Sequence, residues 1–251
     1  FMKRLTDYGF ERQVEWSRYR MNVILGEETF GEDYRRYLAG CLGLDLDQPD
    51  GLRILSSMGV GELGLNLFFE TPFSVMLRRL AQRDAAFARE WMGMDPASTA
   101  LPFLFASDPR RIFVEILDPD AAGYGAVTIS MLDPGAPIPL LRYQTGDVGR
   151  RVDSGELAPL CQRRGLPAPP PYPFEWILIS GRQKDRLPNG RHVGQYKDAL
   201  YADRELARNL TGAFRLVFEG TRCTLHVQVA RGGDAGSRVP ARLKQVFGPG
   251  V

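Results

Sequence analysis

The sequence contains few cysteines and histidines. The three cysteines, Cys41, Cys161 and Cys223, lie far apart, so they provide neither a disulfide framework nor a CxxC metal pair. Their scarcity favours the reducing cytoplasm as the location. The two histidines, His192 and His226, have no neighbouring metal ligand in the sequence and do not support a Ser-His-Asp triad.

The chain also lacks a strong net charge and a long apolar run. Its net charge is +2, from 32 basic and 30 acidic residues, which is too small for a nucleic-acid-binding surface. No apolar run reaches the length of a membrane span, and no secretory signal is visible. With 251 residues, of which 44% are hydrophobic, the chain can bury a sizeable core. Neither nucleic acid nor a membrane is therefore expected as a partner.

Strand and helix patterns alternate in the first hundred residues. Residues 22–26 and 52–55 are short apolar runs typical of buried strands. Residues 29–32, Thr-Phe-Gly-Glu, form a capping box and predict a helix start. Thr71-Pro72 predicts a second start. The buried side of that second helix is expected to contain Phe73, Met76, Leu77, Leu80, Phe87 and Trp91. This alternation predicts an α/β layer.

The middle of the chain has the pattern of an antiparallel sheet. Three short strands joined by Asp, Pro and Gly turns are predicted at residues 112–117, 126–132 and 138–143. The apolar residues of the third strand are expected to enter the core: Ile138, Leu140 and Leu141.

The end of the chain resembles a small α+β domain. A proline-rich connector at residues 166–173 is followed by a strand at 176–180. Beyond it, a helix is predicted at residues 196–210, strands at 214–219 and 222–230, and a last helix at 240–247. The predicted fold class is α/β plus α+β, divided into residues 1–180 and 181–251.

Four predicted strands are each followed by glycine and charged residues. These segments are Gly26–Glu28, Met58–Glu62, Tyr143–Asp147 and Gly181–Asp185. A nucleotide site needs a carboxylate for the ribose hydroxyls, another for Mg²⁺ and cations for the phosphates. Glycine lets the backbone approach such a ligand closely. Taken singly, each segment is also typical of an ordinary turn.

The order of these segments resembles the adenylate-forming (ANL) superfamily. "PLLRYQTGDVGR" and "FVEILDP" are most similar to its phenylacetate–coenzyme A ligase branch, and the likeness extends from about Phe1 to about Phe247. The resemblance implies that residues 1–180 are the C-terminal part of the large domain, with mixed sheets, helices and a small antiparallel β subdomain. It implies that residues 181–251 are a small mobile lid.

The resemblance also implies roles for individual residues. Asp147 would accept hydrogen bonds from the ribose hydroxyls of ATP, and Glu62 would be the catalytic ligand of Mg²⁺. Arg182 would reach ribose or phosphate, and Lys184 would be the catalytic hinge about which the lid rotates. The adenine would lie against two segments of the chain: Gly26, Glu27 and Glu28, and Met58 and Gly59 with the residues up to Gly61.

The activity implied is ATP-dependent activation of a carboxylic acid, in this branch an aromatic or bulky one. The acyl-adenylate would then pass to a thiol, either coenzyme A or the arm of a carrier protein. The implied cofactors are ATP, Mg²⁺ and coenzyme A, and no side chain has to act as a nucleophile. A homodimer is left open.

Some residues depart from the family pattern. Met58 replaces an aromatic residue and Gly61 a hydroxyl residue of the Y-G-x-[ST]-E motif. The family's phosphate-binding loop and C-terminal lysine are expected before residue 1 and after residue 251, so the chain is predicted to be a fragment. The alternative interpretation is a degenerate, non-catalytic homologue that binds nucleotide or acid. The aromatic run at residues 65–73 is compatible with either core packing or an acyl pocket.

Overall fold

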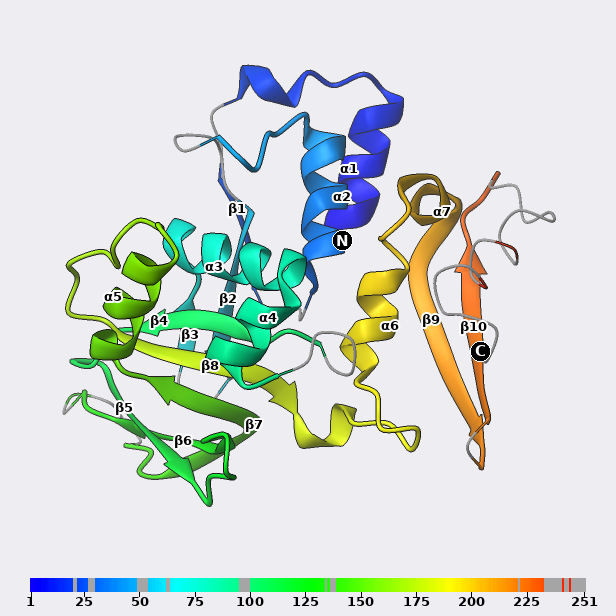
Figure 1. The fold of residues 1–251 in the computed structure, drawn as a ribbon. Coiled ribbons are helices and arrows are strands. Elements are labelled where there is room, and N and C mark those ends of the chain that lie inside the picture. The colour runs from blue at the N-terminus through cyan, green and yellow to red at the C-terminus, as the bar shows by residue number, and fades with distance from the viewer. Residues whose placement is uncertain are drawn as a thin grey trace. The chain divides into compact units, whose positions relative to one another are not determined.

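The chain folds into two compact units (Figure 1). The computed structural model describes residues 1–19, 22–26, 30–48, 54–61, 64–94, 100–133, 135, 139–220, 222–232, 241 and 244, without the side chains of Ser17 and Leu65. The first unit comprises Phe1–Val23, Phe30–Ile54 and Arg186–Val251, and the second comprises Ile24–Thr29 and Leu55–Asp185. Segments 1–23 and 30–54 therefore group with the C-terminal segment. The predicted domain boundary at 180/181 stays a prediction.

The second unit contains nearly all of an eight-stranded sheet. Its order is β1-β2-β3-β4-β8-β7-β6-β5, and every neighbouring pair from β2 to β5 in this order is antiparallel. The strands are β1 (Val23–Gly26), β2 (Ile54–Val60), β3 (Gly64–Phe69), β4 (Phe103–Ser107), β5 (Ile112–Leu117), β6 (Gly125–Met131), β7 (Tyr143–Val152) and β8 (Glu175–Arg182). With its helices and a separate two-stranded sheet, the protein has the mixed α/β architecture that the sequence predicted.

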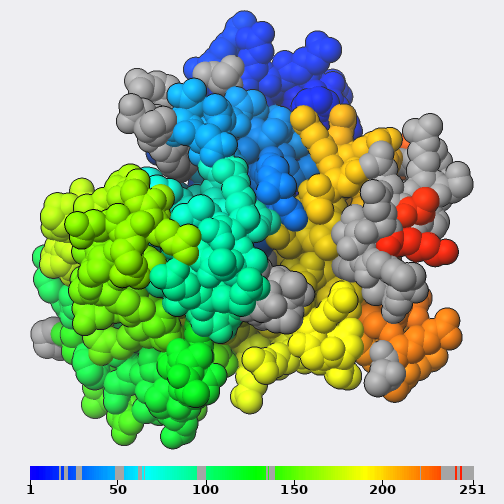
Figure 2. Space-filling view, viewed as in Figure 1, coloured from blue at the N-terminus to red at the C-terminus, as the bar shows by residue number. Residues whose placement is uncertain are grey.

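Helices pack on one face of this sheet. They are α3 (Pro72–Arg83), α4 (Ala85–Phe87), the π-helix η2 (Ala88–Met92) and α5 (Ser154–Arg163). Thr71 caps α3 by accepting the Ser74 amide, which confirms the predicted start. In the space-filling view, the blue-green part of the chain that includes α3 to η2 lies beside the yellow-green part that includes α5 (Figure 2). Arg164, directly after α5, pairs with Asp84 and Glu90.

Side-chain alternation gives strands β4 and β8 two buried faces. Leu104 and Leu178 lie opposite each other and belong to the core beneath the helices. Phe103 and Ile179 are also opposite each other, but their side chains point to the other face of the sheet. The side chains predicted for the buried side of the helix that starts at Thr71-Pro72 do point inward. Four are buried (Phe73, Leu77, Phe87 and Trp91) and two are partly buried (Met76 and Leu80).

The predicted strand at residues 138–143 is wrong. Strand β7 begins at Tyr143, and Arg142 immediately before it has a left-handed backbone with φ of 50°. This reversal separates the apolar run from the strand, so strand alternation does not carry its side chains inward. Leu141 is 72% exposed and Leu140 is half-buried, while Ile138 lies outside the described residues.

The first unit combines helices from both ends of the chain with a two-stranded sheet. Its elements are α1 (Met2–Glu11), η1 (Trp16–Arg18), α2 (Glu32–Leu42), α6 (Val193–Ala199), α7 (Arg204–Asn209), β9 (Leu210–Glu219) and β10 (Arg222–Val229). The Tyr201 ring packs against Tyr34 and Tyr37 of α2. The predicted single helix at 196–210 is wrong, because Asp203 caps a separate helix α7. Most of the predicted helix at 240–247 lies outside the described residues.

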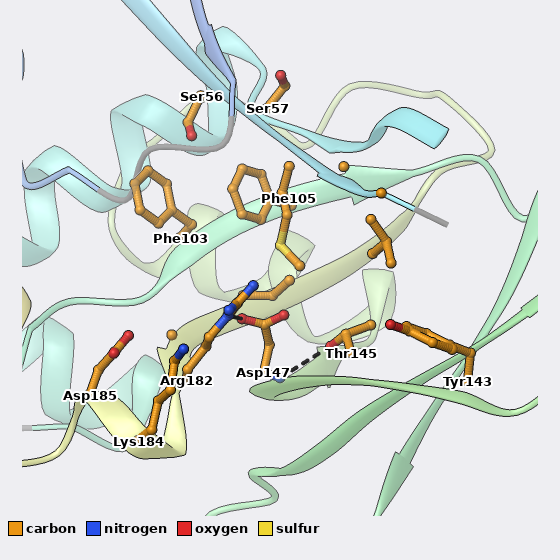
Figure 3. A pocket seen from close by; sticks show the side chains of 16 residues that line it. Ser56, Ser57, Phe103, Phe105, Tyr143, Thr145, Asp147, Arg182, Lys184 and Asp185 are labelled. Carbon is orange, nitrogen blue, oxygen red and sulfur yellow. Dashed lines mark hydrogen bonds and ion pairs between the residues drawn. The ribbon is translucent and has the colours of Figure 1, made fainter. Parts of the chain in front are cut away.

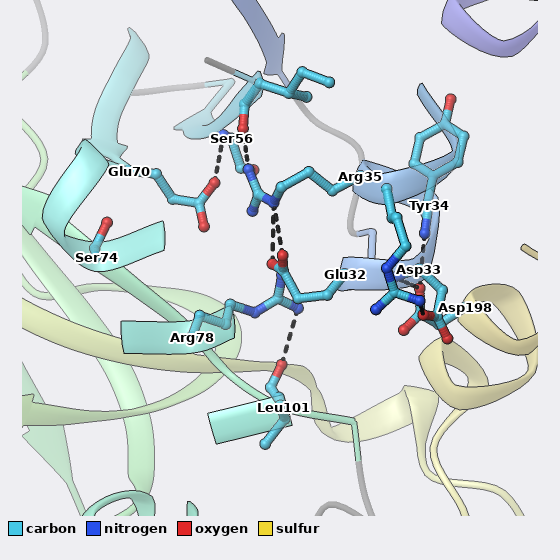
Figure 4. A network of polar contacts seen from close by, with 12 residues as sticks. Glu32, Asp33, Tyr34, Arg35, Ser56, Glu70, Ser74, Arg78, Leu101 and Asp198 are labelled. Carbon is cyan, nitrogen blue, oxygen red and sulfur yellow. Dashed lines mark hydrogen bonds and ion pairs between the residues drawn. The ribbon is translucent and has the colours of Figure 1, made fainter. Parts of the chain in front are cut away.

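Helix α2 begins with a cap that comes from far along the sequence. Its N-cap is Gly31, which has no side chain, and Asp198 of α6 accepts the amides of Asp33 and Tyr34 at 2.9 and 3.1 Å (Figure 4). A Cβ on Gly31 would lie 1.9 Å from the Asp198 carboxyl carbon. The helix therefore does not start at the predicted Thr29 box. Glu32, the other half of that box, pairs with buried Arg35 instead.

Asp198→Ala should lower the free energy of unfolding by about 0.5–2 kcal/mol, because two amides at the start of α2 lose their acceptor. Chemical denaturation measures this loss, and Asp198→Asn, which keeps an acceptor oxygen, should recover most of it. Glu11→Ala on the exposed end of α1 is the matched control. A loss no greater than that of the control would contradict the cap.

Candidate functional site

A cavity of about 740 Å³ lies in the second unit, on the sheet face where Phe103 and Ile179 point (Figure 3). Strands β2, β4, β7 and β8 and the short helix η3 (Gln183–Asp185) contribute to it. The lining consists of Ser56, Ser57, Met58, Gly59, Val60, Gly61, Phe103, Phe105, Tyr143, Thr145, Asp147, Ile179, Gly181, Arg182, Lys184 and Asp185. The volume falls in the range of small-molecule sites, about 300–1,000 Å³.

The floor of the cavity is aromatic. Phe103 and Phe105 occupy alternate positions of β4, and their rings lie 5.1 Å apart with an interplanar angle of 5°. The guanidinium of Arg78 lies 3.9 Å from the Phe103 ring centroid and donates to the carbonyls of Leu101 and Pro102. Parallel rings held in this way provide a flat surface for a planar ligand group.

Asp147 is the buried charged group of the cavity, with only 8% of its surface exposed. It lies opposite Arg182 in the β7–β8 ladder, and Arg182 Nε is 3.8 Å from Asp147 Oδ1. Gly146 before it has φ of 80°, and the ladder register shifts between Val148 and Gly149. A glycine with positive φ and a bulge together redirect the strand where the carboxylate is presented.

Two hydroxyl groups fix this irregular stretch of β7. The Thr145 hydroxyl accepts the Asp147 amide at 3.1 Å and donates to the Val127 carbonyl at 3.4 Å. Ser180 of β8 donates to the Val148 carbonyl at 3.1 Å, next to the register shift. The Thr145 bonds lie at the β6–β7 register shift between Ala126 and Thr128, and the Ser180 bond lies beside the β7–β8 register shift. Side-chain hydrogen bonds therefore support the irregular backbone that carries the carboxylate.

Burial raises the pKa of Asp147, and the nearby charge of Asp185 adds to this effect. The Thr145 side chain and the charges of Arg182 and Lys184 act in the opposite direction. Burial together with specific charged partners makes Asp147 a candidate functional residue.

The structure brings five of the predicted site residues together around the cavity: Met58, Gly59, Asp147, Arg182 and Lys184. Gly26 ends β1 and is not in the lining, although a Cβ on it would lie 3.7 Å from the Ser57 hydroxyl oxygen. Glu27, Glu28 and Glu62 lie outside the described residues. The roles of all these residues stay predictions.

Sequence reasoning missed the aromatic floor. The pattern Phe-Leu-Phe in β4 indicates two faces, but only the pairing of β4 with β8 places Phe103 and Phe105 on the cavity side. In the run at residues 65–73, Leu67 and Phe68 are buried, which agrees with core packing. No described residue of that run lines the cavity.

Within the described ranges, no group of three or more His, Cys, Asp or Glu side chains could hold a metal ion. In the same part of the chain, no helix is both long and apolar enough to cross a membrane. No protein-family model matches the sequence, and a search of curated proteins finds no significant match. The cavity and the motifs around it are therefore the features that bear on function.

Asp147→Asn should stabilise the folded protein at neutral pH. Because burial raises the folded-state pKa, the stabilising contribution of protonated Asp147 is complete below the unfolded pKa of about 3.9. It is lost as pH rises through the folded pKa, whereas asparagine stays neutral. The free energy of unfolding of Asp147→Asn should therefore exceed that of wild type by an amount that grows from pH 4 to pH 8.

Thermal denaturation across this pH range measures the effect, with Asp133→Asn at an exposed turn as the control for removing one charge. A variant that becomes less stable than wild type as pH rises would show that hydrogen bonding to the carboxylate outweighs its burial.

Proposed function

We propose that the protein activates a carboxylic acid with ATP and transfers the acyl group to a thiol. The observation that carries this proposal is a buried carboxylate, Asp147, in a cavity that also has an aromatic floor and two cationic side chains, Arg182 and Lys184. The "RYQTGD" and "GRQKD" segments, which resemble the ANL superfamily, contribute Asp147, Arg182 and Lys184.

Asp147 is proposed to bind the ribose of ATP. An ionised carboxylate accepts two hydrogen bonds from a vicinal diol, and bonds to a charged acceptor contribute more than neutral ones. The ladder partner Arg182 keeps a positive charge 3.8 Å away, which favours the ionised form. Arg182 is half-exposed, so it can turn toward a ligand without leaving a buried position.

The adenine is proposed to lie between the β2 wall and the floor of the cavity. Met58, Gly59 and Gly61 belong to this wall, and two of the three lack a side chain that would block a flat ring. Phe103 and Phe105 offer parallel aromatic faces. Gly26 next to Ser57 would extend the wall, as the resemblance implies.

The phosphates are proposed to face Arg182 and Lys184, the two cations of the lining. Mg²⁺ would supply charge neutralisation at the phosphates, for which one or two protein carboxylates suffice. Glu62 is the predicted ligand and directly follows the lining residue Gly61 in the sequence.

In the proposed first step, a carboxylate oxygen of the acid attacks the α-phosphorus and the bond to pyrophosphate breaks. In the second, a thiol of coenzyme A or of a carrier protein attacks the acyl carbonyl, and AMP leaves. The chain's residues bind and orient the reactants, which is the main protein contribution in such displacements. An aromatic or bulky acid is proposed from the resemblance.

Lys184 is proposed to be the pivot between the two steps. It is exposed and lies in η3, and the second unit ends one residue later, at Asp185. A short 3₁₀ segment between compact units can take up a backbone change without disturbing either core.

Asp147→Ala should weaken ATP binding by about 1.5–3 kcal/mol, because two ribose hydroxyls lose a charged acceptor. Calorimetry on the full-length protein measures the dissociation constant, with Asp133→Ala as the matched control. An unchanged dissociation constant would remove Asp147 from the nucleotide site.

Pyrophosphate release by the full-length protein, measured across a panel of carboxylic acids, then tests catalysis. ATP binding with no pyrophosphate release for any of the acids would favour the alternative, a non-catalytic binding homologue.

Lys184→Pro should impair one half-reaction more than the other, because proline fixes φ near −65° and removes an amide donor. If proline permits the adenylating conformation, acyl-adenylate should still form while thioester formation collapses. Lys184→Ala is the control that removes the side chain but leaves the backbone free. Equal loss in both steps, or a lowered melting temperature that accounts for it, would argue against a pivot.

A further inference from the structure

Glu70 is a buried acidic residue that the proposed function does not use. It follows β3, directly before the helix cap Thr71, and only 3% of its surface is exposed. Burying a carboxylate is unfavourable unless hydrogen bonds replace its lost hydration. The position of Glu70 therefore raises the question of what its carboxylate holds.

The carboxylate holds the backbone of a cavity residue. Glu70 Oε2 accepts the Ser56 amide at 2.7 Å, and the Glu70 amide donates to the Ser56 carbonyl at 2.8 Å (Figure 4). Ser57 pairs with Phe69 in the β2–β3 ladder, so Ser56 lies where the next pair would form. The carboxylate thus takes the place of a backbone carbonyl in the ladder.

The local chain path explains this substitution. Strand β3 ends at Phe69, and Thr71 caps α3, so the backbone leaves the ladder at Glu70. The Ser56 amide would lose its ladder acceptor at this point. A side chain long enough to reach back satisfies it, as an unpaired buried amide requires.

Ser56 begins the segment Ser56–Gly61, which lines the cavity. The β2–β3 register shifts between Met58 and Val60, so the ladder is interrupted in the segment proposed to face the adenine. The paired bonds between Glu70 and Ser56 anchor the other end of this segment. We infer that Glu70 is a positioning residue that fixes the Ser56–Gly61 wall for the ligand. This inference rests on the proposed function for the identity of the ligand.

The test compares two variants of Glu70 in the full-length protein. Glu70→Gln keeps an oxygen that can accept the Ser56 amide, whereas Glu70→Met keeps similar length without a good acceptor. Tyr124→Phe, which removes a buried hydrogen bond to the Met92 carbonyl elsewhere in the same unit, controls for general destabilisation.

Hydrogen exchange without ligand, resolved to single amides by NMR, gives the first measurement. In Glu70→Met the Ser56 amide should exchange at least about tenfold faster, because it loses its acceptor, while the Leu178 amide in the core strand β8 stays protected. Glu70→Gln should restore the Ser56 protection. Equal acceleration at Ser56 and Leu178, or none at Ser56, would overturn the anchor.

Calorimetry with ATP gives the second measurement. Affinity should fall about tenfold in Glu70→Met and return to within about threefold of wild type in Glu70→Gln, with Tyr124→Phe unchanged. Unchanged affinity in Glu70→Met, despite faster exchange at Ser56, would overturn the positioning role. If wild type binds no ATP, the proposed function fails, and the exchange at Ser56 alone supports or overturns the anchor.

Discussion

The antiparallel pairing of β4 with β8 is the contact on which the candidate site depends. It places Phe103 opposite Ile179 on the cavity side and Leu104 opposite Leu178 on the helix side. Strand β8 also pairs with β7, which sets Arg182 opposite Asp147. One strand thus joins the aromatic floor to the carboxylate. Because both faces of the β4–β8 pair are buried, the apolar packing that stabilises the sheet also fixes the geometry of the cavity.

Ionisation of Asp147 is unfavourable in the folded protein. Burial opposes ionisation of this carboxyl, and Thr145 and Arg182 offset only part of that effect. The surrounding backbone is also irregular, with a positive φ at Gly146 and a register shift two residues later. Local features that do not favour stability are concentrated at binding sites in many proteins, because a ligand needs groups that the apoprotein leaves poorly solvated.

Carboxylates complete the backbone hydrogen bonding where regular elements end. Asp198 caps the start of α2 across a large sequence separation, and Glu70 replaces a ladder carbonyl where β3 turns into α3. In both places the backbone amide would otherwise be buried without an acceptor. Asp198 determines where α2 begins, and Glu70 holds the adjacent strand β2. Each of these two side chains therefore links separate segments of the chain within a compact unit.

The sequence by itself determined the features that depend on neighbouring residues. Thr71-Pro72 specified the start of α3, because its capping interactions are local. The glycine-containing segments at Asp147 and Arg182 were predicted to present charged groups, and the structure brings both residues to one cavity, although Asp147 lies within β7 and does not follow a strand at 138–143. Tertiary structure decided the rest. Asp198 moved the start of α2 away from the Thr29 box, and the reversal at Arg142 kept Leu141 out of the core. The insertion of β8 between β4 and β7 selected Phe103 and Phe105 as the floor. These outcomes depend on contacts between distant segments, and a local residue pattern carries no information about which distant strand or side chain will supply the partner.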